Sequence, residues 1–596
     1  MTNSSCIFAL ALLCCFLETI SSLNLTILHL NDFHSRFEPT DAYSGTCTQK
    51  LQTNKGCFGG IARLKAAIDQ EREQVGNSIL LKGGDAFQGT LYYTIHKWRV
   101  VSHFLNKLGM TAMAIGNHEF DDGPEGLEPF IKASTFPLLA CNIQTPEDSI
   151  LRGLIQGSTT LIINGTRIAI IGYTTTDTPT IASVGDTTFL DEIDAINSEI
   201  KPLKEQGIKV FIAVGHSGFQ KDVEIAEKVP DIDVVVGGHT NTFLYTGLGP
   251  SVEEPEGPYP FVVTQESGKK VPVVQAFAFG KYLGRLIVVF NDDGELTDFK
   301  GSPLLLTQEL PEDPEIKKEL EPYSEKVQAI GGKVVGTTRV FLDGRRQNCR
   351  SRECSLGNLA TDAFVNQFTK RKSPDAWSYV SIALLNGGGI RASIDETTSE
   401  GNITIKDIRT SFPFGNMIDV IELKGSTIVK ILEQSVSNEN LDLREGYGGF
   451  LQVSVSQITG IQVVCDTTKP RGTRVKEVFV RCRSCRIPEY FPLNGTEVYR
   501  IATLSFLANG GDGYNIIKTE KLSHESTGIL DFDAISGYVS ENSPIWIGTE
   551  QRIMFRNVET TAEIEEAAEL TSGSKNTVDI SSSFTLAGLF FILVSS

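Results

Sequence analysis

The sequence lacks the excess of basic residues that nucleic-acid binding requires. Its 596 residues contain 54 Lys and Arg against 73 Asp and Glu, which gives a formal net charge of −19 at pH 7. Because nucleic-acid backbones are bound mainly by Lys and Arg, this balance argues against nucleic acid as a partner. A small anionic substrate remains compatible with the charge, since bound cations can reverse the local field.

The N-terminus lacks an apolar run long enough to cross a membrane. The run CIFALALLCCFL, Cys6–Leu17, is too short for a spanning helix but has the length of the hydrophobic region of a signal peptide. We therefore predict a signal peptide over residues 1–22, although Lys and Arg are missing from the positions before the run. A buried N-terminal helix is the alternative.

The C-terminal tail, residues 557–596, ends in an apolar stretch. Three small residues begin at Ser572, a polar spacer follows, and the apolar stretch Phe584–Val594 nearly ends the chain. This order is typical of the signal for a glycosylphosphatidylinositol (GPI) anchor and predicts lipid attachment at Ser572 and a position at the cell surface. A disordered tail with a hydrophobic end, on a secreted protein, is the alternative.

A second CxxC motif is missing, which argues against a zinc–thiolate site in the one CxxC motif present. Of the 11 cysteines, three would leave with the signal peptide, and six of the others stand in close pairs. In the oxidising compartment that secretion implies, we expect these pairs to form disulfides. The pairs are Cys47 with Cys57, Cys349 with Cys354, and Cys482 with Cys485. The remaining two, Cys141 and Cys465, are expected to be free thiols.

Secretion also makes the Asn-x-Ser/Thr sequons candidate glycosylation sites. Outside the predicted signal peptide they begin at Asn24, Asn164, Asn402 and Asn494.

Short internal repeats are absent, but the first half repeats one arrangement. Apolar, often β-branched runs stop, and residues with metal-ligating side chains follow at once. Helical patterns between several runs, such as 62–74 and 191–206, indicate an α/β fold of layered sheets and helices. Sites in such sheets form at the carboxyl ends of strands, so these side chains should converge. They are Asp32, His34, Asp85, Asn117, His118, Asp121, His216, His239 and Asn241.

Asp32 and His34 stand two residues apart at the end of the first run, LHLNDFH. In an extended segment such residues point to the same side, so both can reach one ion. Carboxylate, imidazole and amide ligands suit Zn, Mn or Fe, and the set without His118 and Asp121 is too large for one tetrahedral ion. Two ions that share a carboxylate would fit, with Asp85 as the bridge. Such ions, roughly 3.5–4 Å apart, clamp a phosphate and activate water near neutral pH.

His118 follows Asn117 directly and has Asp121 three residues on. We interpret it as an oriented imidazole that stabilises charge on a transferring phosphoryl group. A histidine that only supports the metals is the alternative. The remaining histidines lack a comparable setting, and we expect structural roles for them: His29, His96, His103 and His524.

The chain resembles the 5′-nucleotidase family over about residues 23–556. The first half matches that family's calcineurin-like metallophosphoesterase domain in LTILHLNDFHSR, GDAFQGT, GNHEFD, GHSGF and VVVGGHTNTFLYTG. The second half, with CRSREC, NGGGIR, FPFG and FLANGGDG, resembles its nucleotide-binding domain. The order of parts is most similar to the GPI-anchored animal ecto-enzymes of the family, which hydrolyse extracellular AMP.

The resemblance implies an α/β (α+β) chain of three parts. A layered β-sandwich metallophosphoesterase domain flanked by helices is expected over 23–310, and a C-terminal α/β substrate-binding domain over 332–556. Between them, the charged helical pattern after a proline-rich entry predicts a linker helix over 311–331. The resemblance further implies two divalent ions, Zn²⁺ in first place, and a homodimer.

The resemblance also implies a role for each site residue. One ion is expected on Asp32, His34, Asp85 and Asn241, and the other on Asp85, Asn117, His216 and His239, with His118 and Asp121 as the catalytic pair. Arg350 and Arg391 are expected on the phosphate, Asn386 on the substrate, Phe414 and Phe506 around the base, and Asp512 on the ribose hydroxyls. Arginine forks suit phosphate, and aromatic faces suit any base. Without the resemblance, core packing and ordinary turns would explain the second-half residues.

These features together predict an extracellular, metal-dependent phosphomonoesterase that converts AMP to adenosine and phosphate. A secreted apyrase that cleaves ATP and ADP on the same scaffold is the main alternative. A non-enzymatic nucleotide-binding or adhesion protein is a further alternative.

Overall fold

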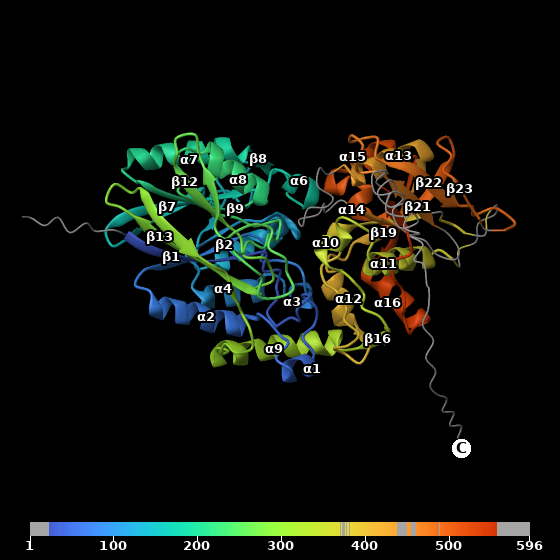
Figure 1. Cartoon of the computed structure of the whole chain (residues 1–596), viewed down its shortest axis with the longest axis horizontal. Helices are drawn as coiled ribbons and strands as arrows, with labels where there is room; N and C mark the ends of the chain where they lie inside the picture. Colours follow the sequence, from blue (N-terminus) through green and yellow to red (C-terminus); the bar gives the residue numbers. More distant parts are fainter. Residues whose placement is uncertain are drawn as a thin grey trace, which may run out of the picture.

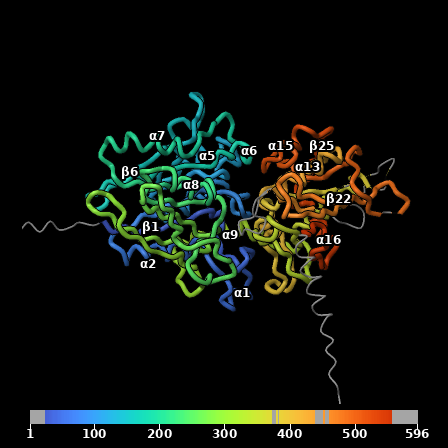
Figure 2. The backbone as a smooth tube through the Cα atoms, turned by 45° about the horizontal axis from the view of Figure 1, so that its top comes forward, coloured from blue at the N-terminus to red at the C-terminus, as the bar shows by residue number. Residues whose placement is uncertain are grey.

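The computed structural model describes residues 23–556, apart from 370, 372–375, 377, 381, 438–449, 454–459 and 488. The predicted signal peptide and the predicted anchor site at Ser572 lie outside the described residues. Figures 1 and 2 show two halves side by side, the first in blue to green and the second in yellow to red. The fold is mixed α/β, as predicted.

Two mixed sheets form the centre of the first half. The first has the order β14-β13-β1-β2-β3-β4, with β15 paired to β13, and the second has the order β11-β12-β10-β9-β7-β6. The strands of the first sheet are β1 Leu23–Asn31, β2 Ser78–Gly83, β3 Ala112–Ala114, β4 Leu138–Leu139, β13 Tyr282–Phe290, β14 Leu296–Gly301 and β15 Leu304–Leu305. Those of the second are β6 Ser158–Ile163, β7 Thr166–Thr174, β9 Val210–His216, β10 Val234–Val236, β11 Phe261–Thr264 and β12 Lys270–Val274. A separate short pair joins β5 Ile143–Gln144 to β8 Thr188–Phe189.

The two sheets pack face to face because their strands are apolar on both sides. In β1, Leu25 and Ile27 pack in the core between the sheets, whereas Leu28 and Leu30 pack in the core under the helices. This split follows from the alternation of side chains along a strand. β1, β2 and β3 run parallel to each other, and so do β9 and β10, so their carboxyl ends can form one edge.

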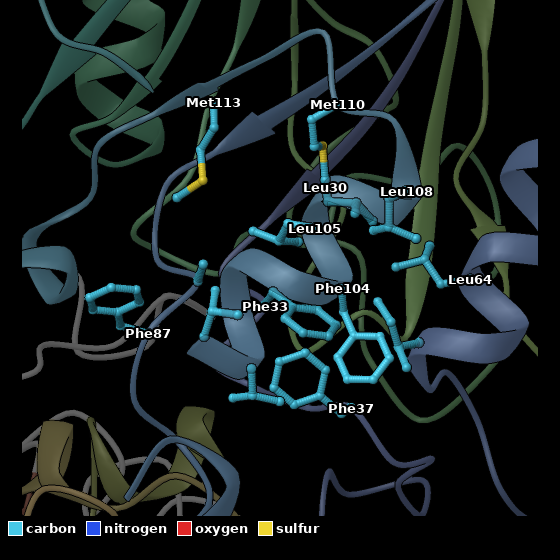
Figure 3. Packing of buried hydrophobic residues seen from close by; sticks show 14 of the residues in the cluster. Leu30, Phe33, Phe37, Leu64, Phe87, Phe104, Leu105, Leu108, Met110 and Met113 are labelled. Carbon is cyan, nitrogen blue, oxygen red and sulfur yellow. The ribbon is translucent and has the colours of Figure 1, made fainter. Parts of the chain in front are cut away.

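Helices cover the outer face of each sheet, which gives four layers. Figure 1 shows α7 and α8 above the sheets and α2, α4 and α9 below them. In Figure 3 the rings of Phe33, Phe37 and Phe104 lie together in the lower core. The helices of this half are α1 Gln49–Thr53, α2 Ile61–Gln74, α3 Leu91–His96, α4 Trp98–Leu108, the 3₁₀ turn η1 Asn117–Phe120, α5 Gly123–Ala133, α6 Thr178–Ile181, α7 Glu192–Glu205 and α8 Phe219–Lys228.

The helix α9, Pro314–Gly331, runs along the lower edge of the first half in Figure 1 and reaches α12, Ile405–Ser411, of the second half. It begins where the Asp313 side chain accepts a hydrogen bond from the Ile316 N–H at 2.8 Å, and it ends at a pair of glycines. The helix lies inside the predicted linker, while the domain bounds themselves stay predictions.

The second half contains a central sheet with the order β20-β17-β24-β19-β25 and a second sheet with the order β23-β22-β21-β26. The central strands are β17 Ile382–Asn386, β19 Met417–Lys424, β20 Leu451–Val453, β24 Val498–Leu504 and β25 Ser523–Leu530. The others are β16 Val334–Thr337 paired to β18 Asn402–Thr404, and β21 Ile461–Cys465, β22 Val475–Arg481, β23 Tyr490–Pro492 and β26 Ile553–Phe555. The helices are α10 Arg346–Cys349, α11 Ser355–Asn366, η2 Gly387–Gly389, α12 Ile405–Ser411, α13 Gly425–Ser435, α14 Ser505–Ala508, η3 Gly511–Gly513, α15 Asn515–Glu520 and α16 Asp531–Asn542.

Disulfides close three local loops: Cys47–Cys57, Cys349–Cys354 and Cys482–Cys485. These are the pairings that the spacing predicts, and Cys141 and Cys465 are free. The first loop meets the second half, because the Thr48 hydroxyl donates to the Thr398 carbonyl at 2.7 Å. Among the described helices, none combines the length and the apolar character that a bilayer-spanning helix needs.

Candidate functional site

Ligand-type side chains from both sheets of the first half meet at one edge. From the first sheet, Asp32 and His34 follow β1, Asp85 follows β2, and Asn117 and His118 begin η1 after β3. From the second sheet, His216 ends β9, and His239 and Asn241 follow β10. Ligating atoms cluster in two groups, His34 with Asp85 and His118, and Asp85 with His216 and His239. Asp85 belongs to both groups.

Asp85 lies at the centre of the site. Its Oδ2 is 3.0 Å from His216 Nε2 and 3.6 Å from His34 Nε2. Its Oδ1 accepts a hydrogen bond from the His118 backbone N–H at 3.0 Å. The carboxylate therefore has one oxygen directed at imidazoles of both groups, as a bridging ligand requires.

The second group is equally compact. Asn117 Oδ1 lies 3.2 Å from His216 Nε2 and 3.0 Å from His239 Nδ1. The two ring nitrogens themselves are 3.3 Å apart. One amide oxygen and two imidazole nitrogens thus converge on one point, which suits a cation.

Two buried oxygens at the site have no hydrogen-bond partner among the described residues, Asp32 Oδ1 and Asn241 Oδ1. The residues are 1% and 3% exposed. A buried oxygen without a partner costs free energy, and a bound cation removes that cost. Because the donor set combines imidazoles, carboxylates and amides, these residues fit divalent ions of the zinc, manganese or iron type.

Backbone carbonyls orient two of the imidazoles. His34 Nδ1 lies 3.1 Å from the Phe87 carbonyl, and His216 Nδ1 lies 2.7 Å from the Gly83 carbonyl. A carbonyl can only accept, so Nδ1 carries a proton in both rings and Nε2 is the nitrogen available to a metal. In both residues Nε2 is the atom that faces Asp85. This is the usual support of a metal-binding histidine.

The loops that follow β1, β2 and β10 and carry predicted ligands, called the ligand loops, adopt an uncommon backbone conformation. Asp32, His34, Asp85, His239 and Asn241 all have positive φ angles, between 47° and 77°. Non-glycine residues rarely take this conformation, and it persists where the surroundings over-determine it. The strands end here because the chain turns sharply at these residues.

His118 and Asp121 form a hydrogen-bonded pair. Asp121 Oδ2 lies 2.8 Å from His118 Nδ1, while His118 Nε2 is 3.9 Å from Asp85 Oδ2. Burial lowers the pKa of His118, but Asp121 and Asp85 raise it, and the net pKa lies above the ordinary value for imidazole. The ring is therefore oriented by one carboxylate and able to hold a proton.

The second half supplies an aromatic ring and a cation to this pair. The ring of Phe414 stacks on His118 with 5.3 Å between centroids and 14° between planes. The guanidinium of Arg391 lies 4.9 Å from the centre of the same Phe414 ring. A cavity at this junction is lined by Asn241, Phe277, Phe279, Arg350 and Arg391, among others. One predicted metal ligand, Asn241, and both predicted phosphate-binding arginines thus line the same cavity.

Asn386 and Asp512 also lie together, with Asn386 Nδ2 donating to Asp512 Oδ2 at 2.7 Å. Burial raises the pKa of Asp512, against the opposing effect of Asn386 and the arginines Arg350 and Arg391. Phe506 packs against Gly511, where an added Cβ would lie 2.5 Å from its ring. Among the described ring contacts there is none between Phe414 and Phe506.

Three supporting residues escaped the sequence analysis. Glu119 is fully buried and accepts hydrogen bonds from backbone N–H groups of both the GDAF and the GNHE segments. Asn31 Nδ2 donates to Asp32 Oδ2 at 3.0 Å. Arg36 lies 4.7 Å from the centre of the Phe279 ring, and burial lowers its pKa to about 9. In the sequence only their position could have indicated these three residues, because each lies within two residues of a predicted ligand.

The remaining predicted sites are placed as follows. Asn24, Asn164 and Asn494 are exposed, and Asn402 is half-buried. His29, His96, His103 and His524 contact Tyr259, Tyr323, Glu319 and Asp419, respectively, away from the ligand groups.

Known proteins resemble the chain along most of its length. Residues 25–243 match the family model of the calcineurin-like phosphoesterases, and residues 334–519 match that of the 5′-nucleotidase C-terminal domain. The 5′-nucleotidases of Bos taurus and Homo sapiens are each 44% identical over 535 residues, which cover 89% of this chain and 91% of each relative. The crystal structure of a 5′-nucleotidase precursor from Thermus thermophilus is 36% identical, with a TM-score of 0.80, and covers 90% of this chain and all of that one.

Proposed function

This chain belongs to the 5′-nucleotidase family, and we propose that it hydrolyses nucleoside 5′-monophosphates, AMP to adenosine and phosphate, as a metal-dependent phosphoric monoester hydrolase. One observation carries the proposal: the two ligand groups, which have Asp85 in common, lie beside an aromatic ring and a guanidinium of the second half, Phe414 and Arg391. The ligand groups can hold metal ions beside a phosphate, and the second half can hold the rest of a nucleotide.

Seven side chains are proposed to hold two divalent ions. They are Asp32, His34, Asp85 and Asn241 for one ion, and Asp85, Asn117, His216 and His239 for the other. Ions bound there would neutralise phosphate charge and lower the pKa of an attacking water. We propose Zn²⁺ because family resemblance favours it and three of the seven ligands are imidazoles, with Mn²⁺ or Fe as the alternatives. Metal analysis of protein purified without chelators tests the identity.

His118 is proposed to stabilise the transition state. Because Asp121 binds its Nδ1–H, the opposite nitrogen faces the metal-ligand groups and can donate a proton to a phosphoryl oxygen. The attacking water forms a bond to phosphorus as the bond to the 5′ oxygen breaks, one proton of the water passes to that oxygen, and the nucleoside leaves as the alcohol. Positioned donors of this kind typically contribute about 10²–10⁴-fold in rate.

The residues of the second half are proposed to bind the nucleotide. Arg350 and Arg391 would hold the phosphate, because a guanidinium matches two phosphate oxygens at once. Asp512 would bind the ribose hydroxyls, and Asn386, which donates a hydrogen bond to Asp512, would contact the substrate. Phe414 and Phe506 are proposed for the base, since aromatic faces accept any base.

The deciding experiment is phosphate release from AMP, ADP and ATP by the purified protein. Rapid release from AMP is expected, with loss of most activity in Asp85→Ala and His118→Ala. His103→Ala is the matched control, because His103 pairs with Glu319 on α9 and lies outside the ligand groups. Rapid ATP hydrolysis without AMP hydrolysis would favour an apyrase. Variants of Asp85 and His118 with full activity would show that the chemistry lies elsewhere.

We also propose where the enzyme is located and how it assembles. A signal peptide, four sequons and an anchor signal at Ser572 support an extracellular glycoprotein held at the cell surface by a GPI lipid, and family resemblance supports a homodimer. Phosphatidylinositol-specific phospholipase C should release the protein from cells, and retention on the membrane would contradict the anchor. Light scattering of the released protein should give twice the mass of the chain.

A further inference from the structure

A buried side chain outside every recognised motif spans the loop that carries His239 and Asn241. Gln275 follows β12 directly and is fully buried. Its Oε1 accepts a hydrogen bond from the Thr242 N–H at 3.1 Å, and its Nε2 donates to the Gly238 carbonyl at 3.1 Å. The two predicted ligands lie between these attachment points, so one amide closes the loop from both ends.

Asp222 determines which way the Gln275 amide points. Asp222 lies on α8 and is fully buried, and its Oδ2 accepts from Gln275 Nε2 at 2.7 Å. Its Oδ1 accepts from the Tyr173 hydroxyl at 2.6 Å. A carboxylate accepts and does not donate, so the NH₂ group of Gln275 must face it. The amide oxygen is then left facing the Thr242 N–H.

The loop depends on such support because of its shape. His239 and Asn241 have φ angles of 77° and 55°, a conformation that surrounding contacts must impose on residues other than glycine. The preceding backbone is packed without spare room. A Cβ on Gly237 would lie 1.7 Å from Asp222 Oδ2, and one on Gly238 would lie 2.1 Å from the Gly83 carbonyl oxygen.

The segment that follows Gln275 holds the other ligand loop as well. The Ala276 N–H donates to Asn31 Oδ1 at 2.9 Å, and the Asn31 amide in turn donates to Asp32 Oδ2. The Phe279 N–H donates to the Asp32 carbonyl at 2.8 Å. One short stretch of chain therefore fixes the positions of ligands from both sheets.

We propose that Gln275 is a positioning residue for both metal ions and that Asp222 and Tyr173 act through it. The inference rests on the proposed function, in which His239 belongs to one ion and Asn241 to the other. Because Gln275 holds the loop that carries both His239 and Asn241, loss of its side chain should displace one ligand of each ion. Gln275 itself has no contact with the reacting atoms in this arrangement.

The test compares Gln275→Met with Gln265→Met. Methionine keeps the length of the side chain and removes its hydrogen bonds. Gln265 is the matched control because it is also buried, and its Nε2 donates to the Ala226 and Val229 carbonyls at 2.8 and 3.0 Å, at the far end of α8. Both variants lose amide-to-carbonyl bonds, and only one of them affects the ligand loop.

Zinc affinity is measured by competition with a chromogenic chelator, and zinc content by mass spectrometry after dialysis. Gln275→Met is expected to bind zinc about 10–100-fold more weakly, the effect usual for lost support of a metal ligand. Excess zinc should restore kcat, with the KM for AMP nearly unchanged. Gln265→Met should keep the zinc affinity of the wild type, even where its melting temperature falls.

Two results would overturn the proposal: wild-type zinc affinity in Gln275→Met, or an equal loss of affinity in Gln265→Met. If Gln275→Met does not fold, Asp222→Ala takes its place. Loss of the carboxylate removes the acceptor that fixes the direction of the Gln275 amide, so weaker zinc binding is again expected and unchanged binding refutes the proposal. A wild-type protein that neither binds zinc nor hydrolyses AMP would refute the proposed function instead.

Discussion

Glu119→Gln is expected to loosen the ligand loops of the first half. The Glu119 carboxylate accepts four backbone hydrogen bonds. Oε1 accepts from Ala86 at 2.7 Å and Phe87 at 3.2 Å, and Oε2 accepts from Asp85 at 2.9 Å and Gly116 at 2.7 Å. The carboxylate thus ties the loop after β2 to the loop after β3, and both loops carry predicted ligands.

The size of the effect follows from the number of N–H groups. Glutamine has nearly the same shape but offers one oxygen and one NH₂ group, so two of the four backbone N–H groups would face a donor. Each buried N–H without an acceptor costs about 1–3 kcal/mol, which gives roughly 2–6 kcal/mol in total. At about 2–4 °C for each kcal/mol, the melting temperature should fall by at least ~4 °C.

Thermal unfolding of the metal-free protein measures this directly, because any loss of bound metal is then excluded. Glu192→Gln is the control. Glu192 is also buried, but the backbone N–H that its carboxylate meets, that of Thr176, lies at a long 3.4 Å. The control should melt close to the wild type. A melting temperature for Glu119→Gln within about 1 °C of the wild type would refute the reasoning, because the four N–H groups would then have other acceptors.

Two further predictions concern metal binding and pH. Each proposed ion has one amide ligand, but the ion on the NDFH segment has one imidazole against two for the other ion, so it should be the more labile one. In a zinc titration Asn241→Ala should lose the weaker of two binding phases, and loss of the tighter phase would contradict this. Burial raises the pKa of Asp531 from 3.8 to about 7. The folded protein therefore keeps a proton that the unfolded chain releases, and the stabilisation from this group, complete below about pH 4, is lost as the pH rises through 7. The free energy of unfolding should fall by up to ~1.4 kcal/mol per pH unit in this range, and this fall should be absent in Asp531→Asn. Denaturant unfolding at pH 5 and 7 measures it, and an equal change in free energy in the wild type and the variant would contradict the assignment.

Local patterns predicted much of the first half. The spacing in LHLNDFH predicted that Asp32 and His34 would lie close together, and Asp32 Oδ1 is 4.0 Å from His34 Nε2. The extended segment expected there was wrong, because both residues follow β1 with φ angles of 47° and 48°, and a turn brings them together. Asp121 lies three positions after His118, which allowed their contact in a single turn, and the two side chains meet at 2.8 Å. The disulfides follow the same rule, because their cysteines lie 3 to 10 residues apart. Contacts within one strand, turn or short loop are set by spacing, and spacing is read directly from the sequence.

The tertiary structure alone decided how distant segments support the site. Gln275 and Asp222 are 53 residues apart, and neither stands in a recognised motif, yet they hold the loop of His239 and Asn241. Likewise, Phe414 reaches His118 only because the two halves pack together. Such contacts depend on the packing of whole sheets and helices, and no periodicity along the chain encodes them. The sequence by itself therefore determined the local contacts among the predicted ligands, while the packing decided that these residues share one focus and which buried side chains hold them there.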